Sequence, residues 1–292
     1  VADAAGTMQA EALGRAQVYV ASYIGIALVL SLWVVPGLVS VLTPLPFRKV
    51  LTHTQDALIT AFATGSLLIV IPLMVERTRE LLDEIGARSP ESEAAVDLMV
   101  PVNFNLPNMG KLLTLSFALF AGWYSGSDVP IEQYPVFLVS GLVSFFGEVI
   151  VAIPFLLDLV RIPEDFFQLF VPVDLLTGRF GTLLAAVHTV AQALLTAAAV
   201  YGAIRIRWAA LVRYVVVSVV LVVALFAGIR LFFEHVVPQA YEADQQLAQM
   251  DLAITRAKAN LYKPDEIEPL PVDVKGTRLA TITKRGRLRV GH

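Results

Sequence analysis

The stretch ALITAFATGSLLIVIPLMV, residues 57–75, is apolar along almost its whole length and is broken near its middle by Thr64, Gly65 and Ser66. Two other apolar stretches are interrupted in the same way, residues 100–123 and residues 136–157. A plain membrane anchor has no reason to break its helix, because backbone groups released in lipid must be satisfied elsewhere. Interrupted helices are tolerated where they line a cavity, and paired ones point to the binding site of a transporter.

The composition is that of a membrane protein. Of the 292 residues, 57% are hydrophobic and only 16% are charged, against about 25% charged in a typical soluble domain. The chain has no cysteine, which excludes a disulfide framework and a thiolate metal site. A net charge of -3 gives no reason to expect a nucleic-acid partner. We therefore predict an all-α membrane protein without a cofactor or metal centre.

Segments long enough to span a bilayer flank the broken stretches. About 20 residues cross the hydrocarbon core, and residues 19–42, 166–204 and 211–233 are long and mostly apolar. Pro36 predicts a kink in the first of them. Residues 76–97 are charged and contain a proline, which indicates a solvated loop.

Basic residues indicate the orientation, because they favour the cytoplasmic ends of membrane helices. They lie at residues 48–49, 77–88 and 205–213, whereas residues 125–133 contain none. If the basic regions are cytoplasmic, the interrupted stretches at 57–75 and 136–160 must each enter and leave from one side. The topology then closes with two re-entrant helical hairpins and an extracytoplasmic polar tail.

Three motifs resemble the second half of the dicarboxylate/amino acid:cation symporters, the glutamate-transporter-like elevator proteins. They are PLPFRKVL at 44–51, DALITAFATGS at 56–66 and VDLLTGRFGT at 173–182, and the similarity covers roughly residues 6–201. The resemblance implies an elevator-type transport domain over residues 1–204, with five family helices before it. Its expected elements are a helix at 19–42, a hairpin at 55–75, a broken helix at 98–124, a hairpin at 134–160 and a helix at 166–204. Residues 205–234 would add one transmembrane helix. The resemblance also implies a homotrimer in a bacterial inner membrane.

The same resemblance implies where a small carboxylate or amino acid would bind. The substrate-binding positions are Thr64, Gly65, Ser66, Asn108, Gly110, Gly147, Asp174, Arg179 and Thr182. The chain departs from the family pattern in the broken helix, where the Asp that contributes to sodium binding is absent. In the last family helix, the Asp and Arg that bind substrate fall on Gly178 and Gly181.

Charged residues inside membrane segments cost about 2.5–3.5 kcal/mol on insertion scales and usually mark ion or substrate paths. We interpret Lys111 and Glu148, at two of the breaks, as ion-coupling residues, together with the amides of Asn103 and Asn105. Lys111 would replace the positive charge of a sodium ion, and Glu148 would carry a proton. The alternative is that the two asparagines and backbone carbonyls still hold sodium.

Structural roles are open for several of these residues. Lys111 and Glu148 would then form an ion pair with no part in transport. Asp174 and Arg179 would lie near the membrane interface, with their charged ends in water. His188, on an Ala/Val/Leu face, is interpreted as a packing residue rather than a metal ligand.

Residues 235–292 are polar and differ from the rest of the chain. We expect an amphipathic helix to residue 262, a proline-rich linker to residue 271, and then the segment TRLATITKRGRLRVGH at 277–292. This segment resembles the first strand of family 3 periplasmic solute-binding domains. The first functional hypothesis is therefore a secondary transporter with a tethered periplasmic receptor. The second is a receptor or sensor whose degenerate transporter half is an anchor. An enzyme is the least favoured class, because no nucleophile–base pair or metal cluster occurs at motif spacing.

Overall fold

The computed structural model describes residues 2–125, 129–163 and 165–236, with side chains over 16–125, 129–163 and 165–232. This part of the chain forms helices and contains no strand. The predicted all-α class is therefore confirmed there. The helix, linker and strand expected in the polar tail lie outside the described residues.

The first long helix changes its hydrogen-bonding pattern where the sequence predicts a kink. Helix α1 (Ala2–Val29) continues through a π-helical turn, η1 (Leu30–Val34), into α2 (Val35–Leu42). Pro36 is the second residue after this turn and has no N–H to donate to the preceding turn. The wider π turn accommodates the missing hydrogen bond.

Helices α3 (Phe47–Thr64) and α4 (Leu67–Glu84) form a helix–turn–helix unit. Gly65 ends α3 with a φ of 65°, in the left-handed region that glycine adopts at low cost. Ser66 follows in an extended conformation and leads into α4. The predicted break is thus a tight turn, and its re-entrant position in a membrane stays a prediction.

The solvated loop predicted for residues 76–97 is wrong. Helix α4 continues to Glu84, and α5 (Pro90–Asn105) begins after a link of only residues 85–89. Ser89 and Ser92 form a reciprocal capping box at the start of α5. This pattern of charges and a proline is therefore a helix end followed by a helix start.

Ion pairs explain why so many charges are compatible with helix in this region. Arg77 pairs with Asp56 of α3 at 2.7 Å and with Glu80 at 2.6 Å. Arg79 pairs with Asp97 of α5 at 2.6 Å. The charged residues thus connect the polar ends of α3, α4 and α5.

The second half of the fold repeats the pattern of broken helices. Helix α5 ends before the residues 106–108, after which α6 (Met109–Leu113) and α7 (Leu115–Ser125) follow. A 3₁₀ turn, η2 (Ile131–Gln133), leads into α8 (Tyr134–Ser144), which a turn joins to α9 (Val149–Leu159). The predicted second hairpin is thus a helix–turn–helix unit, and its re-entrant position also stays a prediction.

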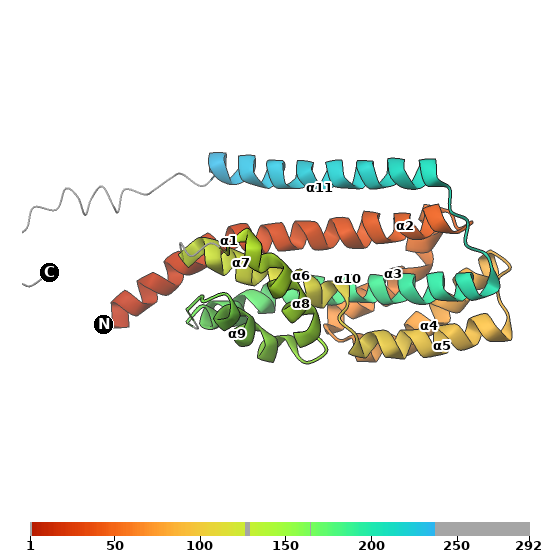
Figure 1. Ribbon diagram of the computed structural model, residues 1–292, viewed down its shortest axis with the longest axis horizontal. Coiled ribbons are helices and arrows are strands. Elements are labelled where there is room, and N and C mark those ends of the chain that lie inside the picture. Colours follow the sequence, from red (N-terminus) through yellow and green to blue (C-terminus); the bar gives the residue numbers. More distant parts are fainter. Residues whose placement is uncertain (1, 126–128, 164, 237–292) are drawn as a thin grey trace, which may run out of the picture. The chain divides into compact units, whose positions relative to one another are not determined.

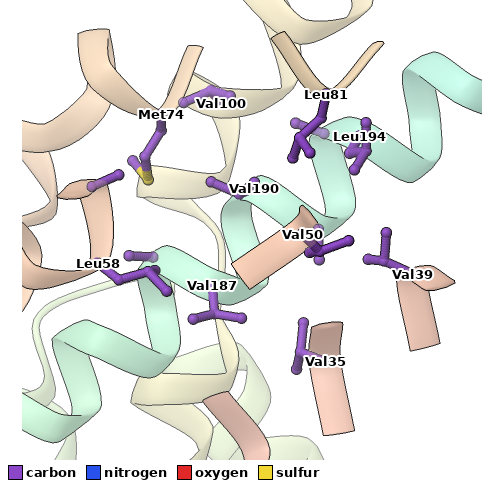
Figure 2. Packing of buried hydrophobic residues seen from close by; sticks show 14 of the residues in the cluster. Val35, Val39, Val50, Leu58, Met74, Leu81, Val100, Val187, Val190 and Leu194 are labelled. Atoms are coloured by element: carbon purple, nitrogen blue, oxygen red, sulfur yellow. The ribbon is translucent and has the colours of Figure 1, made fainter. Parts of the chain in front are cut away.

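Helix α10 (Phe166–Tyr201) is the element that the two halves share. One buried apolar cluster joins its C-terminal half to α2, α3, α4 and α5, and a second joins its N-terminal end to α1, α7, α8 and α9. Figure 1 shows the ribbons of these helices. Figure 2 shows Val187, Val190 and Leu194 of α10 among labelled side chains of the first cluster. The long helix therefore fixes both helix–turn–helix units to one axis.

Three helices are long and apolar enough to cross a membrane, in the part of the chain that was searched. They are Ala16–Leu42, Phe166–Tyr201 and Trp208–Phe232. The last lies in α11 (Trp208–Val236), which packs beside α1 and α2. These helices support a multi-pass membrane protein.

Helix α11 is joined to the first helix by a close contact. The Tyr214 hydroxyl lies 2.7 Å from the Trp33 carbonyl oxygen and 2.8 Å from that of Val34, so it donates next to the π turn. A Cβ at Gly37 would overlap the Tyr214 ring. The glycine thus permits the tyrosine to reach backbone carbonyls that the π turn leaves accessible.

Candidate functional site

The three breaks in the helices meet at one side of α10. They border a cavity of about 470 Å³. Its lining comes from the α3–α4 turn, the α5–α6 break, the α8–α9 turn, α1 and α10. The lining residues are Tyr23, Thr64, Gly65, Leu67, Phe104, Asn108, Gly110, Lys111, Thr114, Glu148, Val149, Asp174, Leu175, Gly178, Arg179, Gly181, Thr182 and Ala185.

The tip of the α3–α4 unit is in contact with an arginine of α10. Arg179 donates from Nη1 to the Ala63 carbonyl oxygen at 2.7 Å. The last carbonyls of a helix have no partner within the helix and carry a partial negative charge. A Cβ at Gly65 would lie 2.6 Å from Arg179 Nη1. Gly65 therefore allows both the turn and the approach of the guanidinium.

The broken helix crosses α10 at two glycines. Asn108 caps α6 by accepting from the Lys111 backbone N–H at 3.0 Å. A Cβ at Gly110 would overlap the carbonyl oxygen of Gly181, so only glycine permits this crossing. A Cβ at Gly181 would lie 2.6 Å from the Tyr23 hydroxyl. The space beside Gly181 is thus bordered by Tyr23 and Gly110.

The tip of the α8–α9 unit is also in contact with a basic side chain. Lys111 donates from Nζ to the carbonyl oxygens of Phe145 and Gly147, each at 3.2 Å. These carbonyls follow the C-terminal end of α8, where a positive charge is favoured. Among the described residues, no ion pair joins Lys111 to Glu148, and Lys111 contacts the two carbonyl oxygens instead.

Two carboxylates complete the charge pattern of the cavity. Asp174 is half-buried on α10, and Glu148 is exposed at the α8–α9 turn. Neither side chain has a hydrogen bond or ion pair with another described residue. The cavity thus contains two basic groups that contact carbonyl oxygens and two acidic groups that are available to a ligand.

Four of the predicted site residues do not line the cavity. Ser66 and Gly147 lie in the turns, and Gly147 contributes its carbonyl oxygen to Lys111. Asn103 is only 1% exposed, and its side-chain nitrogen and oxygen both lack a hydrogen-bond partner. Asn105, two residues later, is exposed. The remaining predicted positions are brought together at the cavity.

Sequence reasoning missed several lining residues, chiefly Tyr23, Phe104 and Thr114. Tyr23 is a polar-ended side chain in an otherwise apolar span, which is a signal that points to a cavity or an interface. Phe104 and Thr114 have no such signal. Within the residues searched, no group of three or more His, Asp or Glu side chains could hold a metal ion.

Comparison with known proteins gives one match. A family model described as the sodium:dicarboxylate symporter family matches residues 1–199. No curated protein and no solved structure matches the chain. The matched range contains all three breaks and nearly all of α10, and it agrees with the resemblance that the motifs indicate.

Proposed function

Because the chain belongs to the sodium:dicarboxylate symporter family, we propose that it transports a small organic anion or amino acid and binds it in the cavity between the two turns and α10. The membrane-spanning helices and the family assignment support transport in general. The volume of about 470 Å³ suits a small molecule, since ligand pockets are usually about 300–1,000 Å³. Membrane lipids surround the protein in this function.

The observation that carries the proposal is that both signs of charge meet at the breaks. Arg179 would bind a carboxylate of the substrate, because charge-assisted hydrogen bonds to a guanidinium are strong. Asp174 has no hydrogen bond or ion pair with the other described residues and would accept from a substrate ammonium group. Asn108 and Thr182 would add neutral hydrogen bonds. An amino acid fits all of these groups, and a simple carboxylate fits part of them.

We further propose that sodium is not the coupling ion. Lys111 already supplies a positive charge to the carbonyls at the C-terminal end of α8, where half-helix carbonyls in other transporters coordinate a cation. Glu148 at the same turn would carry a proton. A sodium-coupled alternative has one observation in its favour. The buried amide of Asn103 has no hydrogen-bond partner among the described residues, so its oxygen would be available to coordinate sodium.

For the polar tail, the proposal rests on the amino-acid sequence alone. Residues 235–292 would carry a tethered extracytoplasmic solute receptor at the bacterial inner membrane, and the whole protein would assemble as a homotrimer. A linked receptor raises the effective concentration of ligand at the transporter. The alternative is a receptor or sensor that uses the transporter half as an anchor.

Uptake by the full-length protein in liposomes tests these proposals. We expect saturable uptake of a radiolabelled amino acid or carboxylate that does not increase with an inward sodium gradient at fixed pH. Asp174→Asn should lower the apparent affinity for an amino acid by about tenfold or more, whereas Asp158→Asn, on the exposed surface of α9, should not.

Three outcomes would count against parts of the proposal. Uptake that rises steeply with external sodium would contradict the coupling. Equal effects of the two aspartate substitutions would contradict the site. Ligand binding without any uptake would favour the anchor.

A further inference from the structure

A basic hollow lies where α2 ends and where α10 is linked to α11. Its volume is about 450 Å³, and it is lined by Ser40, Val41, Thr43, Pro44, Leu45, Pro46, Phe47, Arg205 and Arg207. The backbone N–H of Arg205 donates to the Leu42 carbonyl oxygen at 2.9 Å. This hydrogen bond holds the link against the end of α2, so the two arginines border a defined hollow.

The guanidinium groups of the hollow have no acidic partners. Arg205 and Arg207 are exposed, and their side chains make no ion pair or hydrogen bond with the described residues. No acidic side chain is among the lining residues. In contrast, Arg77 and Arg79 of α4 each form an ion pair with a carboxylate. The two arginines of the hollow are therefore available to an anion.

The hollow lies at one end of all three candidate spans. The first span ends at Leu42, the second ends at Tyr201 and the third begins at Trp208. Trp208 is 70% exposed and Tyr201 is 48% exposed. Aromatic side chains favour the membrane–water interface, so these two mark the level of the lipid headgroups. The hollow opens at that level, at the basic end that the positive-inside rule assigns to the cytoplasm.

We propose that the basic hollow binds the phosphate of an anionic phospholipid. Arg205 and Arg207 donate to the phosphate oxygens, a geometry that guanidinium groups favour. The acyl chains lie along the apolar surface of α11, where Val212, Val216 and Val219 are exposed on one helix face. A lipid is favoured over free phosphate because the apolar helix α11 begins at Trp208, directly after Arg207 of the hollow. The bound lipid stabilises the contact of the α10–α11 link with α2.

Native mass spectrometry of the full-length protein in detergent tests this site. The probes are a phosphatidylglycerol and a phosphatidylcholine with identical acyl chains. We expect the anionic lipid to bind more tightly and the double variant Arg205→Gln/Arg207→Gln to lose about 25-fold in affinity, which is about fivefold for each arginine. Arg230→Gln is the matched control, because Arg230 is exposed near the other end of α11.

The outcomes separate the possible ligands. Equal binding of both lipids, or an equal loss in Arg230→Gln, would overturn the proposal. Displacement of phosphatidylglycerol by millimolar inorganic phosphate would show a site for free anions and would also overturn it. The variant Arg205→Lys/Arg207→Lys keeps the charge and should retain most of the preference for the anionic lipid. If the glutamine variant does not fold, the lysine variant and the wild type, each measured with both lipids, still test the preference for the anionic lipid.

Discussion

The α3–α4 unit and the α8–α9 unit have the same arrangement at their tips, but the rest of the fold holds them differently. Each is a helix–turn–helix whose tip reaches the cavity, and in each a basic side chain from another element donates to carbonyls at the end of the first helix. Arg179 of α10 contacts the first tip, and Lys111 of the broken helix contacts the second. Both turns therefore present a fixed positive charge where a helix end is negative.

The two units differ in how firmly the rest of the fold holds them. Helices α3 and α4 have 18 residues each, contribute to the first buried cluster and are connected by ion pairs at their polar ends. Helices α8 and α9 have 11 residues each, and most apolar side chains of α8 are exposed. Among the described residues, no ion pair involves α8 or α9. The second unit therefore has fewer interactions with the rest of the fold than the first.

Replacing each of the two basic residues by glutamine tests whether the tips have separate roles. Arg179→Gln should weaken substrate binding by about 30-fold or more, because it removes a charged partner of the substrate carboxylate. Lys111→Gln should have a smaller effect on affinity but should make uptake depend on external sodium, since the carbonyls of Phe145 and Gly147 lose their cation. Apparent affinities measured with and without sodium separate the two results. If both substitutions give the same loss, the two tips do not differ in role.

The glycines of the two turns give a matched pair for stability. Gly65→Ala should lower the free energy of unfolding by about 1–2 kcal/mol, because an alanine is strained at a φ of 65°. The new methyl group would also displace Arg179. Gly147→Ala should be nearly neutral, since its φ is not positive and its nearest contact is the Ser144 carbonyl oxygen at 3.4 Å. Thermal unfolding followed by tryptophan fluorescence measures both, and an equal loss would contradict the assigned turn geometry.

The sequence predicts the breaks because their chemistry is local. Gly65 ends a helix in the left-handed region, and Asn108 caps the start of another helix. Both residue types are typical of helix ends, so the sequence itself indicates these positions. The charged segment at 76–97 was predicted wrongly because ion pairs such as Arg79–Asp97 depend on the packing of α4 against α5. Charge alone does not distinguish a solvated loop from paired helix ends.

The meeting of the breaks at α10 could be predicted only through the family resemblance. Lys111 contacts carbonyl oxygens 34 and 36 residues away, and a backbone carbonyl has no sequence signature. Asn103 and Asn105 lie in one polar run, yet one is buried and the other exposed. A polar run indicates a break in a membrane helix, but the face that each side chain takes depends on tertiary packing.

Hydrogen exchange measures directly how firmly each unit is held. Amides of α8 and α9 should exchange about tenfold faster or more than those of α3 and α4, because local opening there exposes less buried apolar surface. The measurement uses the full-length protein in detergent or nanodiscs, with mass spectrometry of peptides from each unit. Similar protection in the two units would contradict the conclusion that the second is held less firmly.

The smallest expected effect concerns the ion pair of Lys49 with Glu84 at the polar end of the first unit. The hydrogen bond from Lys49 lowers the pKa of Glu84 below its ordinary value of 4.5. A lowered pKa in the folded state means that the stabilisation is present above the unfolded pKa and is lost as pH falls through the folded pKa. Glu84→Gln should therefore lower the melting temperature slightly at pH 7, and this difference from the wild type should shrink as the pH falls through the lowered pKa of Glu84. Melting curves of both proteins from pH 7 to pH 3 measure it, with Glu76→Gln as the exposed control on the same helix. A difference that persists unchanged at pH 3 would show that Glu84 acts through packing, and this ion pair would then contribute nothing to the contrast with the second unit.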